Sequence, residues 1–109
     1  MDTQSKVRLV IAKNLKNERQ IRVSVTAGTE LSTQMVAELT VSVEGFLQRA
    51  CAEGKVDSIS YFPLSNRIWK LFVVLNVTGE KQDNLIQQLV GVIEKAIPVE
   101  EIQVDLPNY

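Results

Sequence analysis

The amino-acid sequence of 109 residues contains no histidine and only one cysteine, Cys51. Without histidine the chain cannot form a Ser-His-Asp triad, a histidine-ligated metal site or a Cys₂His₂ zinc finger. A single cysteine excludes an intrachain disulfide, which suits a reducing compartment. Because no imidazole can deprotonate it, Cys51 is expected to be a buried small hydrophobic side chain and not a nucleophile. We therefore predict no catalytic residue, no metal site and no cofactor.

Glycine motifs and long apolar runs are also missing. The five glycines do not form a GxGxxG or GxxxxGK[ST] motif, so the sequence indicates no phosphate-binding loop. The N-terminal apolar run, Leu9 to Ala12, is too short for a signal sequence or a membrane span. These absences predict a cytoplasmic protein that is not an enzyme and does not associate with membranes.

The residues that are present give an average globular composition. Apolar residues make up 45% of the chain and charged residues 23%, which excludes a disordered chain. The length suits one domain with one hydrophobic core. We expect residues 1–109 to form a single α+β domain, with residues 1–18 as an N-terminal extension packed on its core.

Charge of opposite sign is concentrated at the two ends of the chain. Residues 1–22 contain six basic and two acidic residues, a local charge of +4, whereas residues 79–109 contain two basic and six acidic residues, a local charge of −4. A basic end can be a nucleic-acid-binding arm. However, Val7, Leu9 and Ile11 alternate like packed residues. We therefore favour the interpretation that the two ends lie close together and neutralise each other.

Hydrophobic periodicity divides the chain from residue 19 onward into six elements. The pattern predicts, in chain order, a strand at residues 21–27, a helix near 31–53, strands at 56–64 and 67–78, a helix near 80–97 and a strand at 101–106. Thr29 or Ser32 can cap the first helix with a side-chain oxygen. Pro98 ends the second helix, because the residue before a proline is disfavoured in the α region.

This βαββαβ order predicts a ferredoxin-like two-layer sandwich. Two β-α-β units would be joined by a hairpin with a tight turn at Ser65-Asn66. The sheet would be antiparallel with four strands, and both helices would lie on one face. Residues 6–13 form either an added strand or a short helix, and the β-prone sequence Val-Arg-Leu-Val-Ile favours the strand.

The central hairpin has more apolar residues than a sheet with one covered face needs. On residues 67–78 the odd positions form the core set, so the even positions lie on the opposite, helix-free face. If Ser65-Asn66 is a two-residue turn, Tyr61 faces Lys70 and Ile59 faces Phe72. A bulge at Pro63 would reverse this parity. The predicted interface residues on the helix-free face are Ile59, Tyr61, Ile68, Lys70, Phe72 and Val74.

An apolar patch of this size requires a cover in a soluble monomer. Either residues 1–18 fold back over it or a second protein, most simply a second copy, stacks on it. We favour the second explanation and predict a homodimeric protein-interaction or regulatory module. The alternatives are a small-molecule-binding domain and an RNA-binding domain of the same topology. The RNA alternative is less favoured, because residues 67–78 lack the glycine and aromatic pattern of RNA-binding sheets and the chain is slightly acidic.

Overall fold

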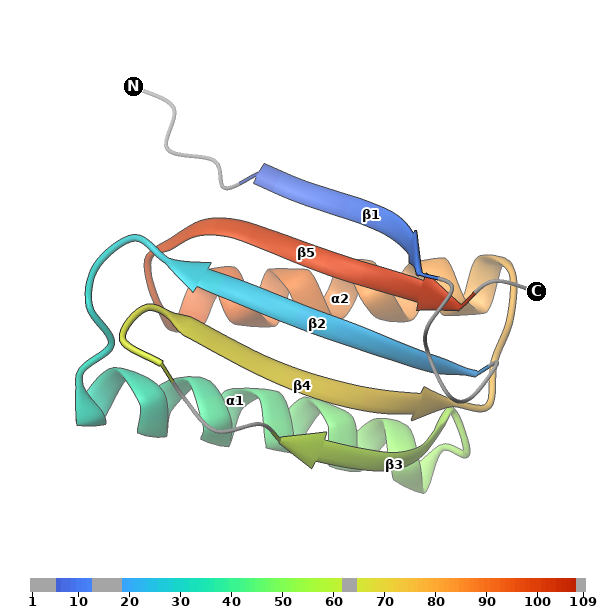
Figure 1. Cartoon of the computed structure of the whole chain (residues 1–109). Coiled ribbons are helices and arrows are strands. Elements are labelled where there is room, and N and C mark those ends of the chain that lie inside the picture. Colours follow the sequence, from blue (N-terminus) through green and yellow to red (C-terminus); the bar gives the residue numbers. More distant parts are fainter. Residues whose placement is uncertain (1–5, 13–18, 62–64, 108–109) are drawn as a thin grey trace.

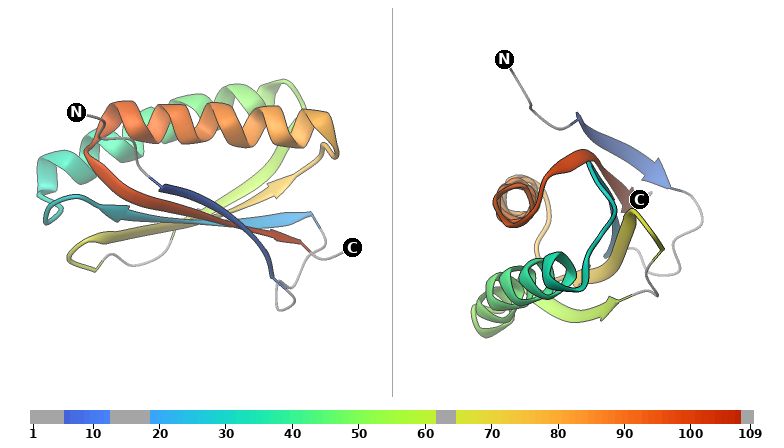
Figure 2. Two further views of the ribbon diagram at one scale, coloured as in Figure 1. Left: turned by 90° about the horizontal axis from the view of Figure 1, so that it is seen from above. Right: turned by 90° about the vertical axis from the view of Figure 1, so that its left-hand side faces the viewer.

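A five-stranded mixed sheet carries two helices on one of its faces in the computed structural model (Figures 1 and 2). The structure describes residues 6–12, 19–61 and 65–107. Their elements are β1 (Lys6–Ala12), β2 (Gln20–Ala27), α1 (Thr33–Ala52), β3 (Val56–Tyr61), β4 (Ile68–Leu75), α2 (Glu80–Ala96) and β5 (Val99–Pro107). The strands lie in the order β1-β5-β2-β4-β3. The β1–β5 pair is parallel and the other pairs are antiparallel.

Local signals in the sequence set the helix boundaries. Ser32 caps α1, because its Oγ accepts a hydrogen bond from the backbone N–H of Met35 at 3.1 Å. The helix ends before Gly54, which has a φ of +77° that only glycine adopts easily. The second helix begins after Gly79 and ends at Ala96, and its C-cap Ile97 is extended, directly before Pro98. Both helices therefore lie where the periodicity predicts them.

The core lies between the two helices and the sheet face that they cover. In β2 every second residue is buried, and the same alternation continues through β4. The core-facing residues of the strands pack against the apolar stripes of both helices. The most completely buried side chains include Ile21, Val23, Leu39, Leu47, Leu71, Ile93 and Ile102. The odd positions of residues 67–78 are thus the core set, as predicted.

Strands β2 to β5 follow the order expected for two β-α-β units joined by a hairpin. The prediction of a wholly antiparallel sheet is wrong, because β1 joins as a fifth strand parallel to β5. Strand β2 already has β4 on one side and β5 on the other. A strand that precedes β2 in the chain can therefore be added only at an edge.

The N-terminal segment and the C-terminal strand lie side by side, as the charge distribution predicts. Residues 6–12 form a strand and not a helix. Arg8 Nη1 lies 3.4 Å from Glu101 Oε1, and Arg22 Nε donates to Asp105 Oδ2 at 2.6 Å. The expected packing of residues 1–18 falls partly outside the described residues, which within that range include only 6–12. In this part the extension lies at the sheet edge and not across the helix-free face (Figure 1).

Candidate interaction surfaces

The hairpin register differs by one residue from the prediction. Ile59 is opposite Val73 and Tyr61 is opposite Leu71, so both residues lie on the helix-covered side of the sheet. Ile59 packs against the core. The Tyr61 ring contacts the Trp69 ring at a centroid distance of 5.9 Å. The predicted placement of Ile59 and Tyr61 beside Phe72 on the helix-free face is therefore wrong.

The connection between β3 and β4 explains the difference. It spans residues 62–67 and is not a two-residue turn at Ser65-Asn66. The Asn66 carbonyl accepts a hydrogen bond from the Leu31 N–H at 2.9 Å, and the Arg67 carbonyl accepts one from the Ala27 N–H at 2.7 Å. These bonds tie Asn66 to the loop before α1 and Arg67 to the last residue of β2. The possible bulge at Pro63 lies outside the described residues.

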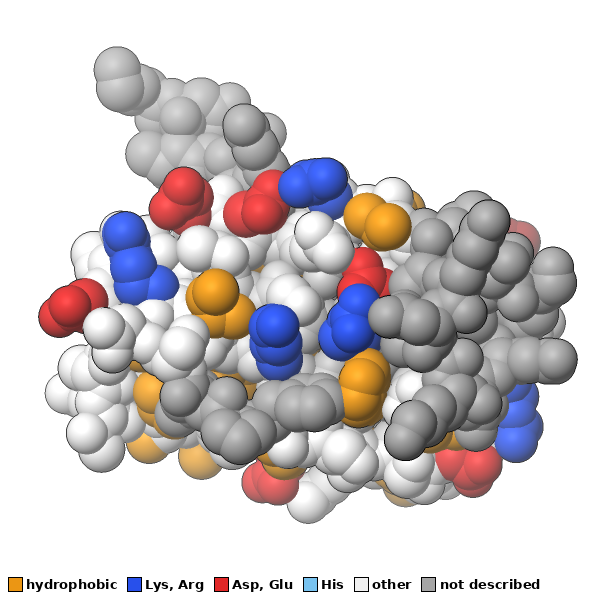
Figure 3. Space-filling view, in the orientation of Figure 1, with side chains coloured by type: hydrophobic (Ala, Val, Ile, Leu, Met, Phe, Trp, Pro, Cys, Tyr) orange, Lys and Arg blue, Asp and Glu red, His pale blue; other side chains and the backbone are white. Residues whose placement is uncertain are grey.

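The other four predicted interface residues do lie on the helix-free face. Ile68 and Lys70 are exposed, whereas Phe72 and Val74 are half-buried. Figure 3 shows this face, on which hydrophobic side chains form separate spots among charged and uncharged polar groups. The loss of Ile59 and Tyr61 makes the apolar patch smaller than predicted.

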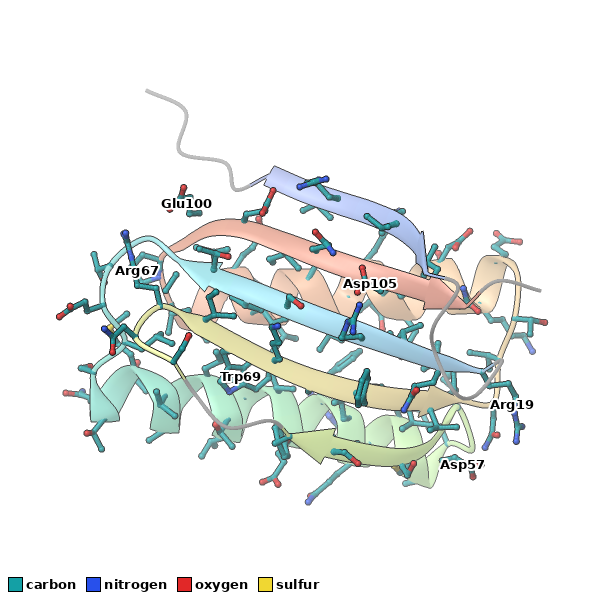
Figure 4. All side chains as sticks on the ribbon, viewed as in Figure 1. Arg19, Asp57, Arg67, Trp69, Glu100 and Asp105 are labelled. Carbon is teal, nitrogen blue, oxygen red and sulfur yellow. The ribbon has the colours of Figure 1, made fainter. Side chains whose placement is uncertain are left out.

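A partly buried polar cluster centred on Asp105 lies near the middle of the helix-free face (Figure 4). Asp105 is only 1% exposed, although it is charged. Its Oδ2 accepts from Arg22 Nε at 2.6 Å and its Oδ1 from Gln103 Nε2 at 2.8 Å. These bonds compensate the carboxylate for its lost hydration. They also neutralise Arg22, one of the basic residues that nucleic-acid binding on this face would use.

Strand β3, at one edge of the sheet, is polar and covered. Its register with β4 is irregular between Val56 and Ser58, and the intervening Asp57 accepts a hydrogen bond from Asn76 Nδ2 at 3.2 Å. Arg19 lies 3.8 Å from the same carboxylate. Helix α1 packs along this strand. Charge, irregular register and a covering helix are the features with which proteins protect sheet edges from further pairing.

Strand β1, at the opposite edge, leaves two of its apolar side chains, Val7 and Leu9, exposed. Val7 and Leu9 are opposite the buried Ile102 and Val104, so they point to the helix side of the sheet. They were expected to be packed inward, but Val7 is 46% exposed and Leu9 60%. A helix is about 10 Å across and strands are about 4.8 Å apart. Two helices therefore cover four strands, and the fifth strand extends beyond them (Figure 2).

A groove of about 400 Å³ lies between β1 and α2. Most of its lining is apolar, and the two polar side chains in it come from α2. The lining residues are Val7, Leu9, Asp83, Ile86, Gln87, Val90 and Leu106. The sequence alone does not indicate this groove, because it depends on which edge the N-terminal strand joins. We call it the β1–α2 groove.

Three further features of the described residues concern catalysis, metal binding and membranes: Cys51, the grouping of acidic side chains and the two helices. Cys51 packs against the core and is partly exposed. No three Asp, Glu or Cys side chains among the described residues are grouped so that they could hold a metal ion. Neither α1 nor α2 is long and apolar enough to cross a membrane.

Comparison with known proteins gives no family for this chain. No protein-family model matches the sequence, and no curated protein matches it. Among solved structures, a prephenate dehydratase from Streptococcus mutans aligns with 96% of this chain at 9% sequence identity and a TM-score of 0.39. The aligned chain spans 61% of that structure's length. With so low a score this likeness carries no argument about function.

Proposed function

We propose that this chain is a non-enzymatic protein-interaction module that self-associates by antiparallel pairing of β1 with β1 of a second copy. The observation that carries this proposal is the exposure of Val7 and Leu9 on an edge strand that no helix covers. In a ferredoxin-like sandwich with this added strand, such pairing would give one continuous ten-stranded sheet. It differs from the face-to-face stacking that the sequence suggested.

The backbone of β1 favours a strand as its partner. Among the described strands, β1 pairs with β5 alone. In a parallel pair, every second residue of a strand directs its N–H and C=O groups away from the neighbour. Those outward groups on β1 need water or another extended segment. An added strand satisfies them and covers the adjacent apolar side chains at the same time.

The apolar side chains restrict the register of such a pair. Val7 and Leu9 share a face of the joined sheet with the partner's Val7 and Leu9 only if the helices of both copies lie on the same side of that sheet. The paired residue numbers then have an even sum, because opposed residues share a face. A sum of 16 places Arg8 opposite Arg8 and is disfavoured by charge repulsion. A sum of 18 pairs all seven residues of β1 and places Leu9 opposite Leu9 on the two-fold axis.

The expected dimer is reversible. Val7 and Leu9 are about half exposed, so their burial contributes roughly 1 kcal/mol for each side chain in each copy. Each backbone hydrogen bond contributes about 1 kcal/mol more. These gains oppose an association cost of at least about 4 kcal/mol. We therefore expect a dissociation constant between about 1 μM and 1 mM.

Sedimentation velocity across this concentration range tests the proposal. Leu9→Lys places two like charges opposite each other on the two-fold axis and is expected to leave a monomer throughout. Val41→Lys is the matched control, because Val41 is 70% exposed on the outer side of α1. It should dimerise as the wild type does. A wild type that stays monomeric at about 1 mM, or a Leu9→Lys dimer of unchanged affinity, would contradict the proposal.

Variants on the helix-free sheet face distinguish pairing of the β1 edges from stacking of the sheet faces. Ile68 is exposed on that face and lies away from β1. If copies stack through the sheet faces, Ile68→Lys and Phe72→Glu should reduce dimerisation and Leu9→Lys should not. If the β1 edges pair, Ile68→Lys should dimerise normally.

A further inference from the structure

The β1–α2 groove combines an apolar surface with two unengaged polar side chains. Asp83 and Gln87 are one helical turn apart on α2 and both line the groove. Neither side chain forms an ion pair or hydrogen bond with another described side chain. Among the described residues that line the groove, Asp83 is the only charged one. A mostly apolar pocket of this volume with a few convergent polar groups is the usual form of a small-molecule site.

The charged group lies at one end of the groove, and Gln87 lies between Asp83 and Val90. Helix α2 runs opposite to β5 and β1 (Figure 1). Asp83 is therefore at the end where β1 and β5 finish, and Val90 is toward the end where they begin. Seven residues of helix separate them, which corresponds to about 10 Å along the helix axis. Between these ends the aliphatic side chains of Ile86 and Leu9 line the two walls, and Gln87 lies one helical turn beyond Asp83.

We propose that the β1–α2 groove binds a small amphipathic molecule with a linear aliphatic body and a cationic amine head. The amine would lie beside the Asp83 carboxylate and donate a hydrogen bond to Gln87 Oε1. The aliphatic body would run along Ile86 and Leu9 toward Val90 and Val7. A chain of about eight carbons has the length that the groove offers. The groove is complete within one chain, so this proposal does not depend on self-association.

Titration of the full chain with octylammonium at neutral pH, followed by NMR, tests the proposal. We expect saturable shifts centred on Val7, Leu9, Ile86 and Val90. Octanoate has the same apolar body and the opposite charge, and it should bind about 2- to 5-fold more weakly. Butylammonium keeps the charge and loses half of the apolar body, and it should bind at least about tenfold more weakly.

Two variants assign the effect of charge to Asp83. Asp83→Asn should remove the preference for octylammonium over octanoate. Glu80→Gln removes an acidic residue of the same helix outside the groove and should leave the preference unchanged. Equal affinities of both octyl compounds for the wild type would overturn the proposal. Equal affinities of butyl- and octylammonium, or shifts located elsewhere, would also overturn it.

Discussion

The two edge strands of the sheet, β3 and β1, differ in how they are protected. Strand β3 has an irregular register at Asp57 and serines at two of its six positions. Helix α1 packs along its length. Strand β1 pairs with β5 without a break in register and lies beyond both helices. Its Val7 and Leu9 are among the most exposed large hydrophobic side chains in the described residues.

This difference distinguishes an edge that ends a sheet from an edge that can be extended. Proteins protect an edge strand with charge, irregular pairing or a covering element, because unprotected edges pair with other strands. All three occur at β3. Strand β1 carries two basic residues, Lys6 and Arg8, and the Arg8 guanidinium reaches toward Glu101 of the neighbouring β5. It has neither the irregular register nor the covering helix of β3, and this less protected edge is the one at which we place the interaction.

The largest predicted effect is a loss of stability when the ion pair between β5 and β2 is removed. Strand β5 is the strand with which β1 pairs. Asp105→Ala removes the buried carboxylate that binds Arg22 and Gln103. It should lower the free energy of unfolding by about 2–3 kcal/mol, because Arg22 is left partly buried without its counter-charge. Glu101→Ala removes only the exposed pair with Arg8 and should cost about 0.5 kcal/mol or less. Urea denaturation measures both, and equal losses would contradict this distinction.

The next prediction compares apolar truncations at the two edges. Ile59→Ala should destabilise the monomer by about 1–2 kcal/mol, since Ile59 packs against the core on the covered side of β3. Leu9→Ala should cost about 0.5 kcal/mol or less, because Leu9 is 60% exposed. Both are measured by urea denaturation at low protein concentration, where dimer formation does not contribute. A greater loss from Leu9→Ala would mean that β1 is packed within the single chain.

The smallest predicted effect is a titration shift at the end of β3. Burial raises the pKa of Tyr61 above its ordinary value of 10.0, and the nearby Glu44 carboxylate raises it further. Glu44→Gln should lower the Tyr61 pKa but leave it above the ordinary value, which ultraviolet difference titration can follow. The folded chain retains the phenolic proton longer than the unfolded chain. This group therefore lowers the free energy of unfolding as the pH rises through about 10. An unchanged pKa in Glu44→Gln would exclude the charge contribution.

Local patterns in the sequence predict the helices and central strands well. The α1 stripe, its Ser32 cap and the end of α2 before Pro98 depend on residues close together in the chain. The alternation of β4 correctly assigns Trp69, Leu71 and Val73 to the core. Ile68 and Phe72 follow on the other face. These features are fixed by backbone geometry and nearby side chains, so they can be read from one sequence.

Features that depend on distant contacts are predicted less well. The register of β3 depends on the connection at residues 62–67, of which Asn66 bonds to the loop before α1 and Arg67 to the end of β2. A shift of one residue moved Ile59 and Tyr61 to the other face. The exposure of Val7 and Leu9 depends on the edge that β1 joins and on how far α2 reaches. The opposite charges of the two chain ends correctly predicted that these ends lie close together. They did not predict that β1 lies beyond the helices with Val7 and Leu9 exposed.

The most direct measurement is disulfide cross-linking of Leu9→Cys in a Cys51→Ser background. Pairing of all seven β1 residues places residue 9 opposite its copy, with Cα atoms about 4.5–5.5 Å apart, within disulfide range. Mild oxidation should therefore give a covalent dimer of Leu9→Cys in high yield. The Val41→Cys control, exposed on α1, should stay a monomer under the same conditions. If Leu9→Cys cross-links no better than Val41→Cys at concentrations where the protein sediments as a dimer, the β1 edges do not pair.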